Sequence, residues 1–322
     1  MKNILIVGAG GQIGSELVPH LQRIYGADHV VATDIKADTK SSQKLAQNGI
    51  FEELDALNAA QFAELVGRYR IDTIFNLVAL LSATGEKNPQ LAWKINMGAL
   101  LNSLEIAREH RCAVFTPSSI GAFGESSPHD NTPQDTVMRP STIYGVCKVT
   151  GELLGDYYHS RFGVDARSVR FPGIISNETL PGGGTTDYAV EIYYAAVRGQ
   201  EFVCPIPQGS YMDMMYMPDA LDAVVQLMEA DPAKLVHRNS FNITAMSFEP
   251  SAIYEAIRRR RPDFKMTYNV DPVRAAIANS WPNKMDDSCA RAEWGWSPKW
   301  DLESMTDDML RVIADKYSKG LI

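Results

Sequence analysis

The sequence contains few of the residues that build metal centres or disulfide frameworks. Its 322 residues include four cysteines and six histidines, and neither set shows the spacing of a metal site. So few cysteines are typical of a reduced, cytoplasmic chain. No apolar run approaches the ~20 residues that cross a membrane. We therefore expect no metal site and no membrane attachment.

Basic side chains are also scarce. The chain has 31 basic and 39 acidic residues, and its net charge is -8. A nucleic-acid binder needs a basic face, so this charge balance argues against a nucleic-acid partner. The one basic run, Arg258 to Arg261, precedes Pro262 and is typical of a solvated helix end.

The first half of the chain alternates short apolar runs with helical patterns. Buried parallel strands are expected at residues 4–7, 30–33, 72–77, 113–116 and 164–171. Helices are expected at residues 11–25, 58–69, 88–110 and 141–161. Such alternation predicts an α/β fold with a doubly wound parallel sheet.

The pattern loosens after Phe171. A loop is expected at residues 181–186. Helices are expected near 187–199, 218–229, 249–260 and 301–317, with strands near 201–204 and 240–244. We predict a dinucleotide-binding domain over residues 1–172. Residues 173–322 would form a smaller α/β substrate lobe, with some segments returning to the main sheet.

A glycine pattern follows the first strand and opens the first helix. Glycine lets the backbone approach a pyrophosphate, and the helix N-terminus offers free N–H groups to it. We therefore assign Gly8, Gly11, Gln12, Ile13 and Gly14 to a cofactor site.

Asp34 ends the second strand and indicates which dinucleotide binds. A carboxylate at this position accepts hydrogen bonds from the ribose hydroxyls and repels a 2′-phosphate, which predicts NAD rather than NADP. We place Ile35 in the same site. Asp55, between the strands expected at 30–33 and 72–77, is a candidate to hydrogen-bond the adenine amine of the cofactor. A solitary surface aspartate with no role in binding is an equal alternative.

Tyr144 and Lys148 lie four residues apart on one expected helix, so their side chains share a face. A neighbouring ammonium favours the phenolate form of a tyrosine, which makes it a usable base. Ser119, just after the strand expected at 113–116, is placed to hold a substrate oxygen. We assign these three residues to catalysis.

Several segments together resemble the extended short-chain dehydrogenase/reductase superfamily. They are the glycine pattern, Lys94–Met97, Ser118–Gly124, Tyr144–Lys148 and Tyr216–Ala220. The resemblance implies a Rossmann fold, NAD across the sheet edge, and an ordered Ser119–Tyr144–Lys148 site. It adds Leu77, Ala79, Asn96 and Pro172 to the cofactor site. It also implies a homodimer, formed through the helices near 88–110 and 141–161.

Two departures from the superfamily narrow the substrate. Enzymes that act on sugar nucleotides typically place Asn where this chain has Gly173 and Arg where it has Met212. Losing both polar groups leaves little to bind a diphosphate. Other segments resemble the short-chain type of L-threonine 3-dehydrogenase: Leu77–Ala83, Arg170–Ile175, Gly183–Ala189, Ser280–Pro282 and Trp294–Pro298. This resemblance implies NAD-dependent oxidation of the threonine β-hydroxyl to 2-amino-3-oxobutanoate.

A small zwitterion needs neutral hydrogen-bond donors and a cover rather than a charged clamp. We expect the substrate to contact Ser82, Ser119, Tyr144, Gly184, Thr185, Thr186 and Trp281. For three of these an alternative remains: Ser82 as a loop cap, Thr186 as a helix N-cap, and Trp281 as packing between lobes.

Two other functions stay open at this point. A sugar-nucleotide epimerase or dehydratase would keep NAD through a full cycle and release no net NADH. A redox-sensing regulator would bind NAD without chemistry, but such chains commonly lose the Tyr144–Lys148 pair that is intact here.

Overall fold

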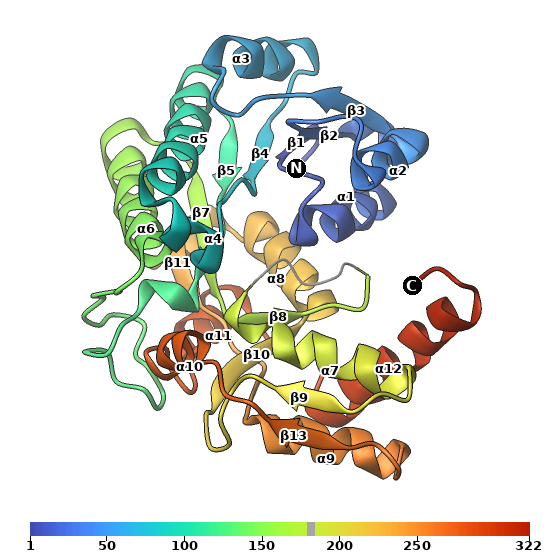
Figure 1. Ribbon diagram of the computed structural model, residues 1–322. Helices are drawn as coiled ribbons and strands as arrows, with labels where there is room; N and C mark the ends of the chain where they lie inside the picture. The colour runs from blue at the N-terminus through green and yellow to red at the C-terminus, as the bar shows by residue number, and fades with distance from the viewer. Residues whose placement is uncertain (179–183) are drawn as a thin grey trace.

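The computed structural model describes residues 1–178 and 184–322, and its main element is a parallel sheet (Figure 1). The strand order is β11-β7-β5-β4-β1-β2-β3, and β6 also pairs with β7. The strands are β1 (Ile4–Val7), β2 (Val30–Asp34), β3 (Ile50–Glu53), β4 (Thr73–Asn76), β5 (Ala113–Phe115), β6 (Ser118–Ser119), β7 (Ala166–Phe171) and β11 (Asn239–Asn242). All these pairings are parallel, which confirms the predicted Rossmann-type α/β fold.

Helices cover both faces of this sheet, which explains why a central strand such as β1 is apolar along its whole length rather than alternating. Ile4 and Ile6 face one buried cluster, whereas Leu5 and Val7 face another. The first cluster is covered by α1 (Gln12–Tyr25), α2 (Lys40–Asn48) and α8 (Met217–Glu229). The second is covered by α3 (Ala59–Arg68), α5 (Pro89–His110) and α6 (Ile143–Phe162).

Local capping signals set the ends of the two long helices near the site. Asn88 is the N-cap of α5 and Pro89 its first residue, within the helix expected at 88–110. The Thr142 side chain accepts a hydrogen bond from the Gly145 N–H at the start of α6. Gly163 ends α6 with a φ of +71°, a left-handed conformation that favours glycine.

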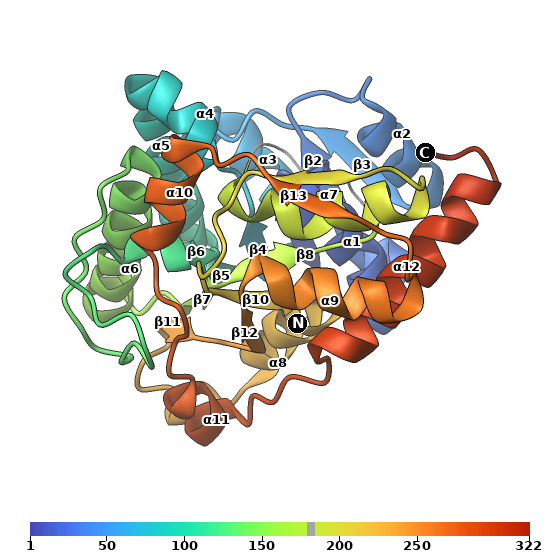
Figure 2. The same cartoon turned by 60° about the horizontal axis from the view of Figure 1, so that its bottom comes forward.

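A smaller lobe packs below the main sheet, and Figure 2 brings it forward. Its sheets have the orders β12-β10-β8 and β13-β9. Its strands are β8 (Gly173–Ile175), β9 (Phe202–Cys204), β10 (Met212–Tyr216), β12 (Met246–Phe248) and β13 (Met266–Tyr268). The remaining helices of the chain are α4 (Ser82–Lys87), α7 (Tyr188–Val197), α9 (Pro250–Arg260), α10 (Pro272–Asn279), α11 (Ser288–Trp294) and α12 (Leu302–Ser318).

One strand that follows Phe171 lies in the main sheet: the strand expected at 240–244 is β11, which pairs with β7. The loop expected at 181–186 falls partly on residues 181–183, which lie outside the described residues, and Thr185–Asp187 form a 3-10 helix, η3. Within the described ranges, no helix is long and apolar enough to cross a membrane.

Asp213 links the lobe to the segment that carries Trp281. It lies in β10 and is buried. Its carboxylate accepts hydrogen bonds from the Thr244 hydroxyl (2.6 Å) and the Met285 N–H (2.8 Å). Burial is the main cause that raises the pKa of the Asp213 carboxyl to about 7 from an ordinary value of 3.8.

The stability of the wild type should fall as the pH rises, and Asp213→Asn should abolish much of this fall. The carboxyl binds its proton more tightly in the folded than in the unfolded chain, so its ionisation between about pH 4 and pH 7 favours unfolding. Asparagine keeps an oxygen for the Met285 N–H and cannot ionise. The free energy of unfolding is measured with urea at about pH 5 and about pH 8. Between these values it should fall by ~1–3 kcal/mol more in the wild type than in the variant. Asp38→Asn, at an exposed aspartate, is the control; equal pH dependence in wild type and Asp213→Asn would refute the assignment.

Candidate active site

In the glycine loop between β1 and α1, two glycines are required by the fold and a third has open space beside it. Gly8 has a φ of +82°, and a Cβ on Gly14 would lie 2.7 Å from the Ala9 Cα. The fold itself therefore requires these two glycines. A Cβ on Gly11 would meet nothing closer than the Gly8 oxygen at 3.5 Å, so internal packing does not exclude a side chain there. A bare backbone at this helix start fits the close approach of a pyrophosphate.

Asp34 is held against this loop. Its carboxylate accepts hydrogen bonds from the Gly10 N–H and the Ile35 N–H, both at 2.8 Å. A Cβ on Gly10 would lie 2.9 Å from an oxygen of that carboxylate, so the loop and the end of β2 are in direct contact. The remaining lone pairs of Asp34 are available to ribose hydroxyls, and Ile35 is exposed beside it.

Two other predicted cofactor residues have local structural partners. Asp55 accepts a hydrogen bond from the Leu57 N–H at 2.9 Å and so caps a turn. Asn96 on α5 accepts a hydrogen bond from the Leu80 N–H (2.7 Å) and donates one to the Leu80 oxygen (3.2 Å). Asn96 therefore fixes the loop that follows β4. This loop begins at Leu77 and contains Ala79. Direct contacts of Asp55 and Asn96 with NAD stay predictions.

The structure brings the three predicted catalytic residues together. Ser119 ends β6, and its Oγ accepts a hydrogen bond from the Gly121 N–H at 3.1 Å. A Cβ on Gly121 would lie 3.3 Å from a ring carbon of Tyr144 and 3.4 Å from the Ser119 Oγ. Both side chains therefore border the same glycine. The Lys148 Nζ lies 5.2 Å from the centre of the Tyr144 ring and donates a hydrogen bond to the Pro117 oxygen at 2.5 Å.

A backbone contact sets the position of α6 against this site. A Cβ on Gly145 would lie 2.2 Å from the Gly121 oxygen, so a larger residue at this position would push the helix away. Tyr144 is its neighbour in sequence. The glycine thus allows the first turn of α6 to lie close to the segment that follows Ser119.

Beneath this site lies a buried polar network that we did not predict. Glu152 of α6 and Arg170 of β7 are each buried and form a bidentate ion pair, with N–O distances of 2.8 and 3.0 Å. Ser118 donates a hydrogen bond to the Glu152 carboxylate. The sequence holds one signal for this network, because Glu152 follows Lys148 by one helical turn and so continues its face.

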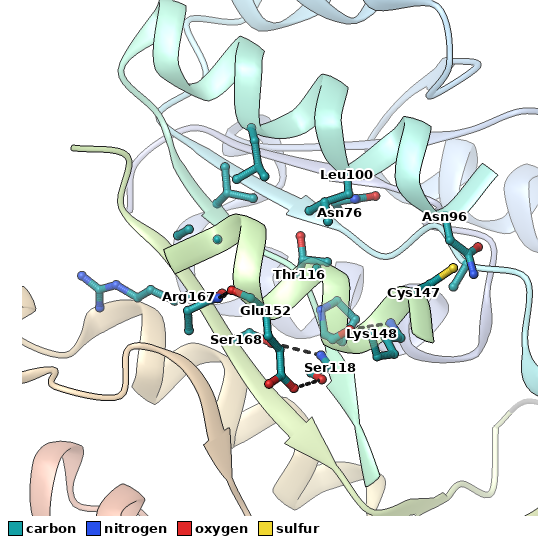
Figure 3. A pocket seen from close by; sticks show the side chains of 18 of the residues that line it. Asn76, Asn96, Leu100, Thr116, Ser118, Cys147, Lys148, Glu152, Arg167 and Ser168 are labelled. Carbon is teal, nitrogen blue, oxygen red and sulfur yellow. Dashed lines mark hydrogen bonds between the residues drawn. The ribbon is translucent and has the colours of Figure 1, made fainter. Parts of the chain in front are cut away.

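Figure 3 shows Ser118 and Glu152 among the side chains that line a small cavity. Its volume is about 40 Å³, and Asn76, Thr116, Cys147 and Lys148 are among its lining residues. The Asn76 Nδ2 and the Thr116 Oγ1 are buried and have no hydrogen-bond partner among the described residues. The size and polar lining of the cavity suit an ordered water next to Lys148.

Apart from Ser119 and Tyr144, the predicted substrate residues come from three separate segments. Ser82 begins α4 and is buried, and Thr185 is buried in η3. The Gly184 N–H donates a hydrogen bond to Asp187 at 2.7 Å, so this backbone group already has a partner. Trp281 is buried in a cluster with Ile120, Phe123 and Met285. It therefore packs against the segment that directly follows Ser119.

Gly173 and Thr186 are in close contact. A Cβ on Gly173 would lie 2.4 Å from the Met214 sulfur and 2.7 Å from the Thr186 Cγ2. Met212 is buried and belongs to the same apolar cluster as Met214. An asparagine at position 173 would require Met214 and Thr186 to shift, because they fill the space that its side chain would take.

Known proteins share this chain's sequence and fold. Residues 4–244 match the NAD dependent epimerase/dehydratase family. An uncharacterised epimerase/dehydratase of Staphylococcus aureus is 57% identical over 98% of both chains. The solved L-threonine dehydrogenase of Clostridium difficile is 54% identical, with a TM-score of 0.96 over 98% of both chains. The holo form of a GalE-like L-threonine dehydrogenase from Cupriavidus necator is 48% identical, with a TM-score of 0.93 over 96% of this chain and 99% of that one.

These matches confirm both the superfamily and the resemblance to L-threonine 3-dehydrogenases that the sequence motifs indicated. They also agree with the glycine loop and with Asp34, whose geometry fits NAD. The chain therefore belongs to the NAD-dependent epimerase/dehydratase family, and its cofactor is NAD.

Proposed function

We propose that this chain is an L-threonine 3-dehydrogenase, which oxidises the β-hydroxyl of L-threonine to 2-amino-3-oxobutanoate. The observation that carries the proposal is the contact of Gly173 with Met214 and Thr186. It disfavours the polar side chain that sugar-nucleotide enzymes typically place there, since Met214 and Thr186 would have to move, while Ser119, Tyr144 and Lys148 remain together. The high similarity to solved L-threonine dehydrogenases supports the same reading.

The three catalytic side chains have distinct roles in this proposal. Tyr144 accepts the proton of the substrate hydroxyl as general base. Ser119 holds that hydroxyl beside the Tyr144 oxygen, and the Lys148 ammonium lies 5.2 Å from the centre of the Tyr144 ring. Accepting a hydride from the β-carbon is the chemistry that NAD supplies when it is bound.

Neutral groups bind the amino-acid end in this proposal. Ser82, Thr185 and Thr186 supply hydroxyls for the carboxylate, and Trp281 and Leu80 are apolar walls for the substrate methyl. Because Trp281 packs on Ile120 and Phe123, it also helps to exclude water near Ser119.

Exposed apolar side chains on α5 and α6 support the proposed homodimer. A two-fold contact through these helices would cover side chains that are now 40–61% exposed. They are Leu91, Trp93, Leu101, Val146, Leu153 and Tyr157. We further propose a cytoplasmic location, which the four free cysteines support.

Substrate choice tests the proposed activity directly. With purified protein and NAD, the appearance of NADH absorbance should be fast with L-threonine. It should be ~10–200-fold slower with L-serine, because burying one methyl is worth about 1–3 kcal/mol. D-Threonine and L-allo-threonine should also be poor substrates, since inverting either centre misplaces the β-hydrogen or breaks a carboxylate contact. Equal rates with serine and threonine would contradict the proposal, and turnover of a nucleotide sugar without threonine activity would favour the epimerase alternative.

A matched pair of variants tests Thr186. Thr186→Val keeps the shape that packs on Gly173 and removes the hydroxyl, so KM for threonine should rise while NAD affinity stays nearly unchanged. Thr186→Ser keeps the hydroxyl and should retain a KM closer to that of the wild type. A KM that is unchanged in Thr186→Val would remove this hydroxyl from substrate binding.

Tyr144→Phe should remove the general base and leave the ring in place. We expect the rate of threonine oxidation to fall by ~10²-fold or more, with NAD binding retained, because proton transfer by a positioned base contributes about that factor. The control is Tyr317→Phe, at an exposed tyrosine of α12. Near-normal turnover in Tyr144→Phe would exclude Tyr144 as the base.

Light scattering tests the dimer. The wild type should have about twice the 35.6 kDa mass of one chain, and Leu153→Glu should shift it toward the monomer, because a buried unpaired charge disfavours association. Val273→Glu, at an exposed valine of α10, should leave the mass unchanged. A wild-type mass of one chain would show that the dimer proposal is wrong.

A further inference from the structure

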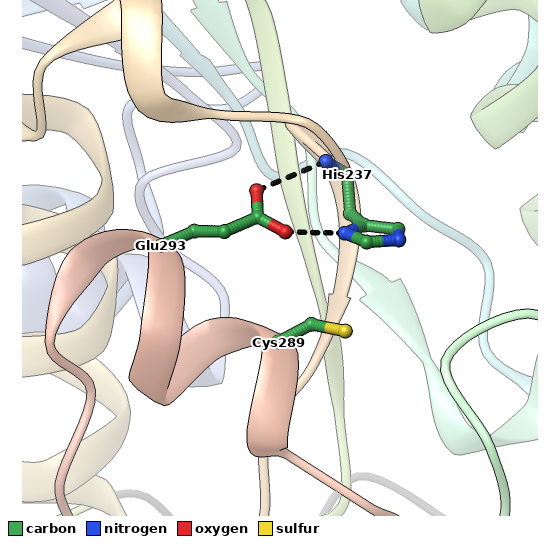
Figure 4. A group of neighbouring side chains, drawn as sticks. All are labelled: His237, Cys289 and Glu293. Atoms are coloured by element: carbon green, nitrogen blue, oxygen red, sulfur yellow. Dashed lines mark hydrogen bonds and ion pairs between the residues drawn. The ribbon is translucent and has the colours of Figure 1, made fainter.

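Three side chains with metal-binding atoms meet beside the edge strand β11. His237 precedes β11, whereas Cys289 and Glu293 lie one helical turn apart on α11. One ligand atom from each residue lies within 4.8 Å of the other two. Figure 4 shows Cys289 and Glu293 extending from α11 toward the His237 ring. None of the three belongs to the proposed catalytic or cofactor residues.

We propose that His237, Cys289 and Glu293 bind a divalent transition-metal ion, best matched by Zn²⁺, which fastens α11 to the edge of the main sheet. Thiolate, imidazole and carboxylate are the ligands that Zn²⁺ takes in proteins. Tetrahedral Zn²⁺ with bonds of ~2.0–2.3 Å separates its ligand atoms by about 3.3–3.7 Å. The present spread of these atoms thus needs small side-chain rotations only.

The surroundings of the cluster hold two of its ligands in place. One oxygen of Glu293 accepts hydrogen bonds from the Val236 N–H (2.6 Å) and the His237 N–H (3.1 Å), which turns its other oxygen toward the His237 Nδ1. The His237 Nε2 lies 3.4 Å from a carboxylate oxygen of Asp135. A metal-bound histidine whose second nitrogen faces a carboxylate is the usual arrangement in proteins, because it fixes the ring and strengthens the ligand.

Charge and access also favour a cation. Asp135 and Asp286 both lie close enough to act electrostatically on the Cys289 thiol. The His237 and Glu293 side chains are 23% and 12% exposed, so an ion can enter from solvent and keep a water as its fourth ligand. On binding, the metal replaces the thiol proton of Cys289, which leaves to solvent, and His237 coordinates through Nδ1 with its ring proton on Nε2.

The position of α11 gives the bound metal a structural role. The segment that carries Trp281 leads through Met285 into α11, and Trp296 after the helix packs in the main core. A metal that joins Cys289 and Glu293 to His237 links this part of the chain to the start of β11. We therefore expect the metal to raise stability, with catalysis carried by a separate set of residues.

Zinc binding is tested on the whole chain after treatment with a chelator. Titration with Zn²⁺ should show about one strongly bound ion per chain and a rise in the thermal midpoint that saturates at that ratio. His237→Gln and Cys289→Ser should each weaken binding by ~10-fold or more. His110→Gln, at an exposed histidine outside the cluster, should bind like the wild type. Failure of the wild type to bind one ion, or unchanged binding in both cluster variants, would overturn the proposal.

Two further measurements keep the result independent of folding defects and of the proposed activity. Co²⁺ in place of Zn²⁺ should give the charge-transfer absorption of a Co²⁺–thiolate bond in the wild type, and the band should be absent in Cys289→Ser. Glu293→Gln keeps an oxygen for the Val236 and His237 N–H groups, so it should fold normally and bind Zn²⁺ weakly. Bound Co²⁺ without this band would exclude Cys289 as a ligand. None of these readouts requires threonine turnover.

Discussion

The buried ion pair of Glu152 and Arg170 is the contact on which the catalytic geometry depends. It joins α6 to β7, and Glu152 also accepts the hydrogen bond from Ser118 in β6. Arg170 donates its remaining hydrogen bonds to the Gln134 oxygen (2.8 Å) and to Asn242 of β11 (2.9 Å). Both charges are thereby satisfied. Loss of either partner would leave a buried charge, at a cost of about 3–5 kcal/mol. Ser119, Tyr144 and Lys148 inherit their relative positions from this network.

Close backbone approach is the second constraint, and it acts at both ends of the site. Gly145 lets α6 lie against the Gly121 carbonyl, which brings Tyr144 toward Ser119. Gly173 lets Thr186 and Met214 pack onto the start of β8. The first contact brings together the three proposed catalytic side chains. The second fills the space beside position 173 with Met214 and Thr186.

The chain after β10 connects the lobe to this centre. Asp213 holds the Met285 backbone, and Met285 shares a cluster with Trp281, which packs on Ile120 and Phe123 next to Ser119. The same segment continues into α11, which carries Cys289 and Glu293. Stability at α11 and the position of Trp281 are therefore physically linked through one stretch of chain. Through this linkage, a change at the edge of the main sheet can affect the position of Trp281. The residues at that edge do not themselves contact the catalytic side chains in the proposed mechanism.

The sequence by itself determined the features that depend on neighbours along the chain. Apolar runs gave the parallel strands, Asn88 and Gly163 marked helix ends, and the spacing of Tyr144 and Lys148 placed both on one helix face, because these signals act within a few residues. Tertiary structure decided the rest. It paired β11 with β7, since a strand of four residues, only one of them apolar, carries no local pattern that specifies its sheet. It buried the charges of Glu152, Arg170 and Asp213, and it brought His237 to Cys289 and Glu293. Such contacts join segments far apart in sequence, so no local pattern records them.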